Sequence, residues 1–194
     1  HVLDVAVEPA IAAGLKKFVF TSTYAAVARR RGHTATEDDV ITDERSLTPY
    51  VQSRVQAERL VLEYARTRGL PAVAMCVSTT YGAGDWGRTP HGAIIAGAAF
   101  GKLPFVLGSI ELEAVGIDDA AAALLLAAEK GRVGERYLIS DKMISNAEVV
   151  RIAAEAVGVP APSRTVPLPL TYAMAAVGSL KARLTGTDER LSLD

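Results

Sequence analysis

Short apolar runs alternate with longer periodic runs over the first half of the chain. Residues 17–22 (Lys-Phe-Val-Phe-Thr-Ser) and residues 71–77 (Pro-Ala-Val-Ala-Met-Cys-Val) have the length and composition of buried strands. Each of them follows a helical pattern that a glycine closes, at Gly14 and at Gly69. A helix, a glycine and a short apolar strand, repeated in this order, predict a parallel sheet with crossover helices. The predicted fold class is therefore α/β.

The clearest helical pattern runs from Tyr50 to Arg68. Pro49 suits a helix that begins close to Tyr50, and apolar residues then recur at steps of three and four. The earlier helix, predicted over residues 2–13, contains Pro9, which should kink or divide it. Between the two helices, beyond the first strand, residues 25–48 are polar and predict a loop.

The second half of the chain predicts shorter elements. We expect a helix of small residues over 92–100, strands over 103–107, 113–117 and 137–139, an apolar helix over 120–130 and a last helix near 171–184. Asp118 or Asp119 should cap the apolar helix. Ser145 and Glu148 have the spacing of a capping box, which predicts a helix that extends to Val157.

A glycine cluster follows the second predicted strand. Residues 82–87 (Gly-Ala-Gly-Asp-Trp-Gly) match the letters of the dinucleotide fingerprint G-x-G-x-x-G. That mechanism needs a helix that begins at the third glycine, so that its N-terminus faces a pyrophosphate. Here residues 88–90 (Arg-Thr-Pro) intervene, and Trp86 is bulky for a loop that holds phosphates. We therefore predict a loop on the substrate side, with no helix beginning at Gly87.

Composition narrows the function classes. The chain has 194 residues, 49% hydrophobic and 22% charged, with a formal net charge of −1. This near-neutral balance favours neither nucleic acid nor a membrane surface as a partner, and the arginine triplet at residues 29–31 is expected to be solvated. No run has the length of a membrane span. The single cysteine, Cys76, excludes an internal disulfide framework and fits a reducing compartment, so we expect a cytoplasmic protein.

Four short motifs follow one another along the chain. They are residues 18–23 (Phe-Val-Phe-Thr-Ser-Thr), 50–54 (Tyr-Val-Gln-Ser-Arg), 76–82 (Cys-Val-Ser-Thr-Thr-Tyr-Gly) and 115–119 (Val-Gly-Ile-Asp-Asp). In this order they resemble the extended short-chain dehydrogenase/reductase family, also called the NAD-dependent epimerase/dehydratase family. The corresponding family motifs are a strand ending in the catalytic Ser or Thr, Tyr-x-x-x-Lys, Arg-Pro-x-x-Val-Tyr-Gly and Val-Asp-Asp-Val-Ala. The resemblance covers residues 2 to about 184.

The resemblance implies an incomplete Rossmann-type parallel sheet with a smaller C-terminal substrate lobe. Residues 1–81 would form the C-terminal part of the dinucleotide-binding domain. Residues 82–194 would form mainly the substrate-binding lobe, with segments that return to the Rossmann core. The implied cofactor is NAD or NADP and the implied partner is a small-molecule substrate, with no metal site. The oligomeric state stays open, with a homodimer as one option.

The resemblance also implies roles for individual residues. Thr23, Tyr50 and Arg54 would be catalytic: the Tyr50 phenol would exchange a proton with the substrate hydroxyl, and Thr23 would hydrogen-bond the substrate oxygen. Cofactor contacts would come from Ser22, Tyr50, Arg54, Val77 and Ser78, and substrate contacts from Thr79, Tyr81, Trp86 and His91. Ordinary packing in a loop explains Tyr81, Trp86 and His91 equally well.

Two departures from the family pattern matter. Arg54 stands where the family has lysine; it keeps the positive charge, but its planar fork differs from a compact ammonium. Because Tyr50 and Arg54 are four residues apart on a helix, they share one face, and a cation beside a phenol favours the phenolate. The glycine-rich opening of the family is not found in these residues. Since the chain opens on His1 within a helical pattern, we expect a fragment that is incomplete at both ends.

The expected function is an NAD(P)-dependent reductase or dehydrogenase of a moderately apolar ketone or secondary alcohol, similar to dihydroflavonol reductases or hydroxysteroid dehydrogenases. The apolar later half favours this substrate class, and Cys76 and Val77 depart from the Arg-Pro of the sugar-nucleotide branch. Two alternatives remain open. One is a sugar-nucleotide epimerase or dehydratase. The other is a catalytically impaired NAD(P)-binding regulatory protein, which Arg54 would favour.

Overall fold

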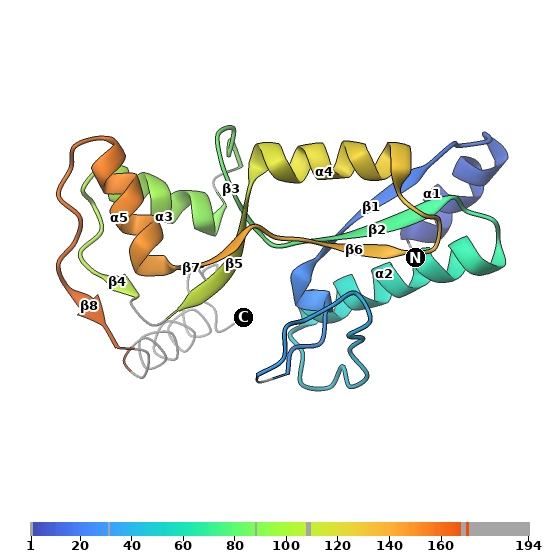
Figure 1. Cartoon of the computed structure of the whole chain (residues 1–194), viewed down its shortest axis with the longest axis horizontal. Coiled ribbons are helices and arrows are strands. Elements are labelled where there is room, and N and C mark those ends of the chain that lie inside the picture. Colours follow the sequence, from blue (N-terminus) through green and yellow to red (C-terminus); the bar gives the residue numbers. More distant parts are fainter. Residues whose placement is uncertain (1, 31, 88, 108–109, 168–169, 171–194) are drawn as a thin grey trace, which may run out of the picture. The chain divides into compact units, whose positions relative to one another are not determined.

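The computed structural model describes residues 2–30, 32–87, 89–107, 110–167 and 170 (Figure 1). The contacts divide the chain into two units, His1–Gly82 with Ala114–Asp141, and Ala83–Glu113 with Lys142–Asp194. Helices and mostly parallel strands build both units, so the predicted α/β class is confirmed. The sequence-based boundary between residues 81 and 82 stays a prediction.

A three-stranded parallel sheet forms the centre of the first unit. Its order is β1 (Phe18–Thr23), β2 (Ala72–Val77) and β6 (Arg136–Ile139). The register of β1 on β2 runs from Phe18 opposite Ala72 to Thr23 opposite Val77. β2 is the central strand, and its first five residues are buried, as a strand covered on both faces requires. The prediction that the strands over 17–22 and 71–77 pair in parallel is confirmed.

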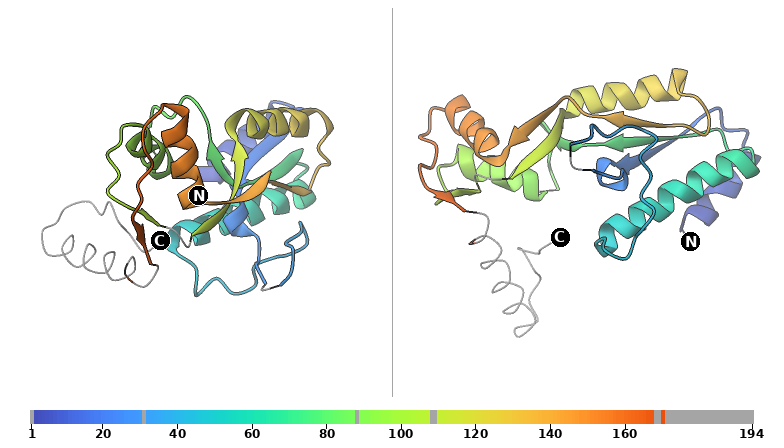
Figure 2. Two further views of the ribbon diagram at one scale, coloured as in Figure 1. Left: turned by 60° about the vertical axis from the view of Figure 1, so that its left-hand side comes forward. Right: turned by 60° about the horizontal axis from the view of Figure 1, so that its bottom comes forward.

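Helices cover both faces of this sheet (Figure 1 and Figure 2). On one face α1 (Val2–Ala12) and α2 (Pro49–Thr67) pack around Val7, Val61 and Leu70. On the other face α4 (Ile117–Lys130) packs on Val73 and Met75, which alternate with Ala72 and Ala74 along β2. α1 is a single helix with Pro9 inside it, so the proline does not divide it. The predicted helix from Tyr50 to Arg68 is confirmed as α2, with Thr48 as its N-cap.

A second sheet has the order β3 (Thr79–Tyr81), β5 (Glu111–Gly116) and β7 (Lys142–Ser145). β3 pairs with β5 in parallel, from Thr79 opposite Ala114 to Tyr81 opposite Gly116. We predicted β5 within two residues of its observed bounds. β3 and β7 were not predicted, because strands of three and four residues carry too little periodicity to detect.

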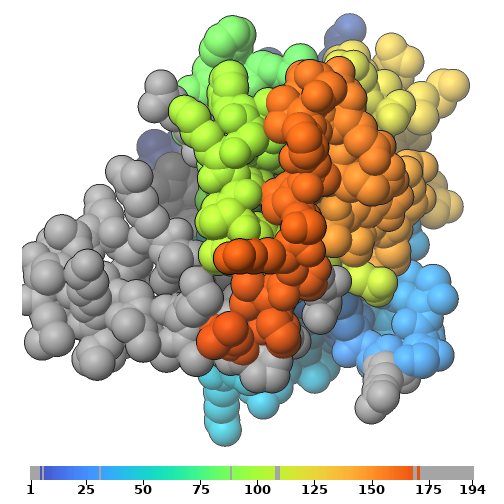
Figure 3. Space-filling model, turned by 90° about the vertical axis from the view of Figure 1, so that its left-hand side faces the viewer, coloured from blue at the N-terminus to red at the C-terminus, as the bar shows by residue number. Residues whose placement is uncertain are grey.

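In the second unit α3 (Pro90–Ala99) packs against α5 (Asn146–Ala156), and Figure 3 shows the two segments side by side. Their shared core contains Ala98, Val106 and Val150. β4 (Val106–Leu107) pairs in parallel with β8 (Thr165–Val166), a strand that the sequence pattern did not predict. The predicted helix near 171–184 lies outside the described residues.

The helix caps test the local predictions directly. The predicted Ser145 cap is confirmed, because its Oγ accepts a hydrogen bond of 3.1 Å from the Glu148 N–H. The predicted aspartate cap of α4 is wrong. Gly116 is the N-cap of this helix, and it makes no side-chain cap hydrogen bond. Asp118 and Asp119 lie within the first turn of α4, where the positive end of the helix dipole stabilises their negative charges. Within the described part of the chain, no helix has the length and apolar character of a membrane span.

Candidate functional site

Two predicted residues stand at the carboxyl ends of neighbouring strands. Thr23 ends β1 and lies opposite Val77, which ends β2. The Thr23 side chain caps the short 3-10 helix η1 (Tyr24–Ala26), because its Oγ1 accepts a hydrogen bond of 3.3 Å from the Ala25 N–H. Open α/β sheets bind ligands at this edge, outside the carboxyl ends of the strands.

Ser78 follows Val77 and is almost fully buried, with 5% of its surface exposed. Its N–H donates to the Ile139 carbonyl at 2.9 Å, so the backbone of the residue is tied to β6. Its Oγ, however, is the one buried side-chain N or O atom in the described part of the chain without a hydrogen-bond partner. Buried polar atoms in folded proteins nearly always have a partner. The unpaired Ser78 hydroxyl therefore lies at the edge where open α/β sheets generally bind ligands.

Tyr50 and Arg54 occupy the first two turns of α2. Tyr50 is 56% exposed, and the Arg54 guanidinium carbon lies 5.4 Å from the centroid of the Tyr50 ring. This is a cation–π arrangement, in which the charge stands over the ring face. The pair therefore combines an accessible phenol with a fixed positive charge.

The segment that joins Thr23 to Tyr50 packs on α2. One buried cluster contains Ala26 of η1, Ile41 of the loop and Val55 of α2. The cluster packs this segment between β1 and α2 against the N-terminal half of α2. The convergence of Thr23, Tyr50 and Arg54 in one site stays a prediction.

Glu58 is the third residue on the same face of α2, at a further step of four, and sequence reasoning missed it. It is only 4% exposed, although it is charged. Its carboxylate accepts hydrogen bonds from Ser22 Oγ, from Cys76 Sγ at 3.2 Å and from Arg136 Nη1 at 3.0 Å. The predicted cofactor-binding residue Ser22 thus directs its hydroxyl into the protein. A carboxylate on the buried face of an amphipathic helix was the available sequence signal.

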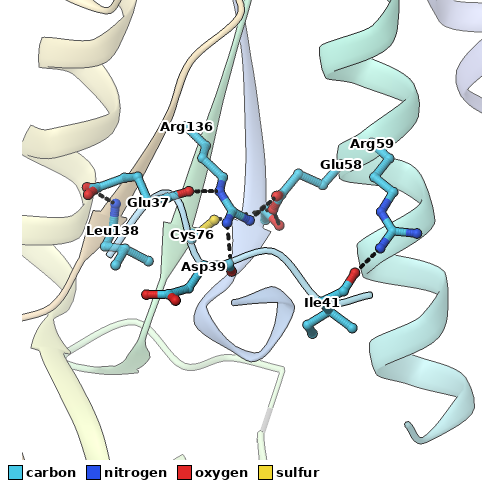
Figure 4. A network of polar contacts seen from close by, with 9 residues as sticks. Glu37, Asp39, Ile41, Glu58, Arg59, Cys76, Arg136 and Leu138 are labelled. Atoms are coloured by element: carbon cyan, nitrogen blue, oxygen red, sulfur yellow. Dashed lines mark hydrogen bonds and ion pairs between the residues drawn. The ribbon is translucent and has the colours of Figure 1, made fainter. Parts of the chain in front are cut away.

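Arg136, also missed, extends this network to the polar loop (Figure 4). Its Nε donates to the Glu37 carbonyl at 2.6 Å and its Nη2 to the Asp39 carbonyl at 2.8 Å. The Glu37 carboxylate in turn accepts from the Leu138 N–H at 3.0 Å, and Arg59 on α2 donates to the Ile41 carbonyl. The predicted loop between the first strand and α2 is therefore held at its middle, on β6 and on α2.

Two ionisable groups in or beside this network have shifted pKa values. Burial and the nearby Glu58 charge raise the pKa of the Cys76 thiol to about 12. The pKa of Asp39 falls to about 2, because its carboxylate accepts a 2.8 Å hydrogen bond from the Thr36 N–H and lies 2.9 Å from His33 Nε2. Outside the network, burial and the neighbouring Tyr24 raise the pKa of Tyr81.

The four predicted substrate residues belong to both units. Thr79 and Tyr81 are the first and last residues of β3, so they share one face of that strand; Thr79 is buried and Tyr81 half-buried. In the second unit Trp86 is 92% exposed. His91 is half-buried in α3, and burial lowers its pKa.

The glycine cluster is a loop, as predicted, and no helix begins at Gly87. α3 starts at Pro90 with Thr89 as its N-cap. The Asp85 carboxylate accepts hydrogen bonds from the Thr89 N–H and from Thr89 Oγ1, at 3.0 and 2.8 Å. The Asp85 carboxylate thus lies at the N-terminal end of α3, the end of a helix at which a phosphate would otherwise bind. The described residues also hold no group of three or more His, Cys, Asp or Glu side chains that could bind a metal.

Comparison with known proteins supplies the family. A sequence profile of the NAD-dependent epimerase/dehydratase family matches residues 2–140. A Synechocystis sp. protein described as a dihydroflavonol 4-reductase is 33% identical over 168 residues, which cover 83% of this chain and 48% of the relative. The dTDP-glucose 4,6-dehydratase of Haemophilus influenzae is 32% identical over 150 residues, covering 76% of this chain and 44% of the relative.

Among solved structures, a nucleoside-diphosphate-sugar epimerase from Pseudomonas aeruginosa is similar to this chain. It is 25% identical with a TM-score of 0.75, and the match covers 95% of this chain and 65% of the epimerase. The chain spans about half the length of the two curated relatives.

Proposed function

The chain belongs to the NAD-dependent epimerase/dehydratase family, and from this premise we propose that the whole protein is an NAD(P)-dependent oxidoreductase of the extended short-chain dehydrogenase/reductase type. The observation that carries the proposal is the Tyr50–Arg54 pair, an exposed phenol with a guanidinium over its ring. The pair lies at the start of α2, the helix that follows the strand ending in Thr23.

The residues at the sheet edge fit a nicotinamide cofactor. The unpaired Ser78 hydroxyl gives the fit its structural support, since a bound amide or hydroxyl could complete its hydrogen bonding. Val77 and Ser78 would line the nicotinamide, and Tyr50 and Arg54 would contact the adjoining ribose. When bound, NAD(P) donates or accepts a hydride. Ser22 would contribute through its place in β1, because its hydroxyl is engaged by Glu58.

The chain's own residues would handle the proton and the substrate oxygen. Tyr50 holds a proton at an accessible phenol oxygen, and general acid–base catalysis needs a group within hydrogen-bond reach of the substrate. Arg54 would stabilise negative charge that develops on this phenol. Thr23 Oγ1 accepts from a backbone N–H, which leaves its own O–H to donate to a substrate oxygen. Tyr81, whose pKa is raised, stays protonated and would act as a hydrogen-bond donor.

For the substrate we propose a moderately apolar ketone or secondary alcohol. The similarity to a protein described as a dihydroflavonol 4-reductase supports this class, as do Cys76 and Val77 in place of Arg-Pro. Thr79, Tyr81, Trp86 and His91 would contact the substrate. The single, buried cysteine fits a reducing, cytoplasmic location.

A second candidate is a sugar-nucleotide epimerase or dehydratase. The Haemophilus influenzae dehydratase, 32% identical, and the Pseudomonas aeruginosa epimerase favour it. A catalytically impaired NAD(P)-binding protein is the third candidate, because Arg54 replaces the family's lysine.

The test uses the full-length protein with NADH and NADPH. We expect turnover of apolar ketones, no conversion of dTDP-glucose or UDP-glucose, and near loss of turnover in Tyr50→Phe. Tyr64→Phe is the matched control, because Arg68 stands 4.4 Å from the Tyr64 ring at the other end of the same helix. Conversion of a sugar nucleotide would establish the second candidate. Cofactor binding without turnover, in both the parent and Arg54→Lys, would establish the third.

A further inference from the structure

One buried carboxylate joins the helix that carries Tyr50 to the strand that carries Thr23. Tyr50, Arg54 and Glu58 are spaced by four along α2, so they lie on one face of the helix. Glu58, two turns below Tyr50, accepts a hydrogen bond from the hydroxyl of Ser22. Ser22 immediately precedes Thr23 in β1. The path from the proposed acid–base group to the residue beside the substrate oxygen therefore runs through Glu58.

The contacts of Glu58 tie α2 to three strands at one level of the sheet. Ser22 on β1, Cys76 on β2 and Leu138 on β6 are register partners. Glu58 binds the side chains of the first two, and its ion pair with Arg136 reaches β6, two residues before Leu138. Glu58 and Arg136 are 4% and 9% exposed. Water therefore cannot replace these hydrogen bonds without opening the core.

The same arginine holds the connection between Thr23 and Tyr50 at its middle. Its guanidinium donates to the carbonyls of Glu37 and Asp39 (Figure 4). Only a planar guanidinium presents donors in the directions needed to reach a carboxylate and two carbonyls together.

We propose that Glu58 and Arg136 are positioning residues that set the place of Tyr50 and Arg54 relative to Thr23. The inference rests on the proposed function. Apolar contacts between a helix and a sheet are non-directional and allow small shifts along the helix axis. Such shifts are opposed by the directional hydrogen bonds that the Glu58 carboxylate accepts from β1 and β2, and by its ion pair with Arg136 of β6. Catalysis needs this precision, because a misplacement of about 1 Å can lower a rate by about 100-fold.

The decisive variant removes both charges at once, Glu58→Gln with Arg136→Met. Since no lone charge stays buried, the pair of changes should lower the melting temperature by only a few degrees. We expect kcat to fall roughly 10- to 100-fold while the KM for the cofactor stays within about twofold. The matched control is Glu155→Gln with Arg151→Met, which removes an exposed ion pair of 2.7 Å on α5. It should leave kcat unchanged.

A second measurement does not depend on turnover. Amide hydrogen exchange over residues 37–41 and over the first turn of α2 should quicken in the Glu58/Arg136 variant and stay unchanged in the control. If the double variant does not fold, Ser22→Ala replaces it, with an expected loss in kcat of about tenfold. The proposal is overturned if kcat of the folded variant stays within about twofold of the parent, or if exchange does not change.

Tyr50→Phe, measured alongside, separates the two claims. If Tyr50→Phe keeps full turnover, the proposed function fails, and hydrogen exchange alone decides whether Glu58 and Arg136 hold α2 and the loop. If Tyr50→Phe is inactive but the Glu58/Arg136 variant keeps full kcat, only the positioning role fails.

Discussion

At the scale of single residues, the environment decides what each reactive group can do. Cys76 is fully buried and donates its S–H to Glu58 at 3.2 Å. Burial and the Glu58 charge both disfavour the thiolate, which raises the pKa of the thiol to about 12. The thiolate is the nucleophilic form of cysteine, and a thiol with this pKa forms almost none of it at neutral pH. Cys76 therefore has a structural role, as a hydrogen-bond donor to Glu58.

We therefore expect Cys76 to resist alkylation by iodoacetamide in the native protein at about pH 8, and to react fully once the chain is unfolded in denaturant. Cys76 is the only cysteine among these 194 residues, so mass spectrometry of the peptide that contains it gives an unambiguous result. Stoichiometric labelling of the native protein within minutes would contradict the assignment.

Arg54 supports the second prediction at this scale. Its guanidinium stands over the Tyr50 ring, so Arg54→Met should lower turnover by removing the positive charge next to the phenol. Arg54→Lys should retain or raise activity, because it restores the residue that the family uses. Tyr50→Phe should lower turnover by about 100- to 10,000-fold, the range of general acid–base catalysis. Steady-state kinetics of the full-length protein measures all three. Equal activity of Arg54→Met and the parent would remove Arg54 from the mechanism.

At the scale of elements, the loop between β1 and α2 gains its order from side chains outside it and from a carboxylate within it. Arg136 and Arg59 bind its carbonyls, and the Asp39 carboxylate accepts from Thr36 and faces His33. These contacts satisfy the carbonyls of Glu37, Asp39 and Ile41, which lie in the middle of the irregular loop.

The loop should weaken in acid. The pKa of Asp39 is lowered from 3.8 to about 2, so its ionised form stabilises the fold above about pH 4, and this stabilisation is lost as the pH falls towards 2. Asp39→Asn should lower the melting temperature at neutral pH, and the difference from the parent should shrink between about pH 4 and about pH 2. Thermal unfolding of both proteins across this range tests it. A difference that does not vary with pH would show that the Asp39 charge is not responsible.

The Ser145 cap provides a prediction for α5. Its Oγ satisfies the Glu148 N–H, one of the helix N–H groups that have no partner within the helix. Ser145→Ala should cost about 1 kcal/mol of unfolding free energy, and Ser145→Asp should cost much less, because aspartate also caps well. Denaturant unfolding gives both values. Equal destabilisation by the two substitutions would argue against capping as the cause.

At the scale of the whole molecule, long-range polar contacts connect parts of the first unit that lie far apart in the sequence. Arg136 joins Glu58, 78 residues earlier, and Asp39, 97 residues earlier. In the low-dielectric interior, removing only one partner of such an ion pair is strongly destabilising, because the other charge stays buried without a counter-ion.

Arg136→Met alone should therefore destabilise the protein by about 3–5 kcal/mol, because it leaves the Glu58 carboxylate buried without its counter-ion. Adding Glu58→Gln should recover part of this loss. Arg151→Met breaks an exposed pair and should change the stability by less than about 1 kcal/mol. Chemical denaturation of the full-length protein compares the three. A cost for Arg136→Met as small as that for Arg151→Met would show that the buried pair contributes little.

The sequence by itself determined the elements whose signal is local. Periodicity, glycine and proline within a few residues predict the two main strands, α2 with its proline start, and the loop over residues 82–87. The roles of Thr23, Tyr50 and Arg54 stay predictions from short motifs. The predicted cap of α4 failed, because β5 continues to Gly116 and the helix begins directly after it.

Only the tertiary structure decided the network behind the site. The position of Glu58 on the apolar face of α2 is a sequence signal for burial, but nothing near Glu58 or Arg136 in the chain identifies their partners. These partners come from other strands and from the loop. The short strands β3, β7 and β8 likewise depend on neighbouring strands, because β3 and β7 lie in one sheet with β5, and β8 pairs with β4. The physical reason is range: local patterns depend on neighbouring residues, whereas a buried ion pair depends on where separate strands and helices pack.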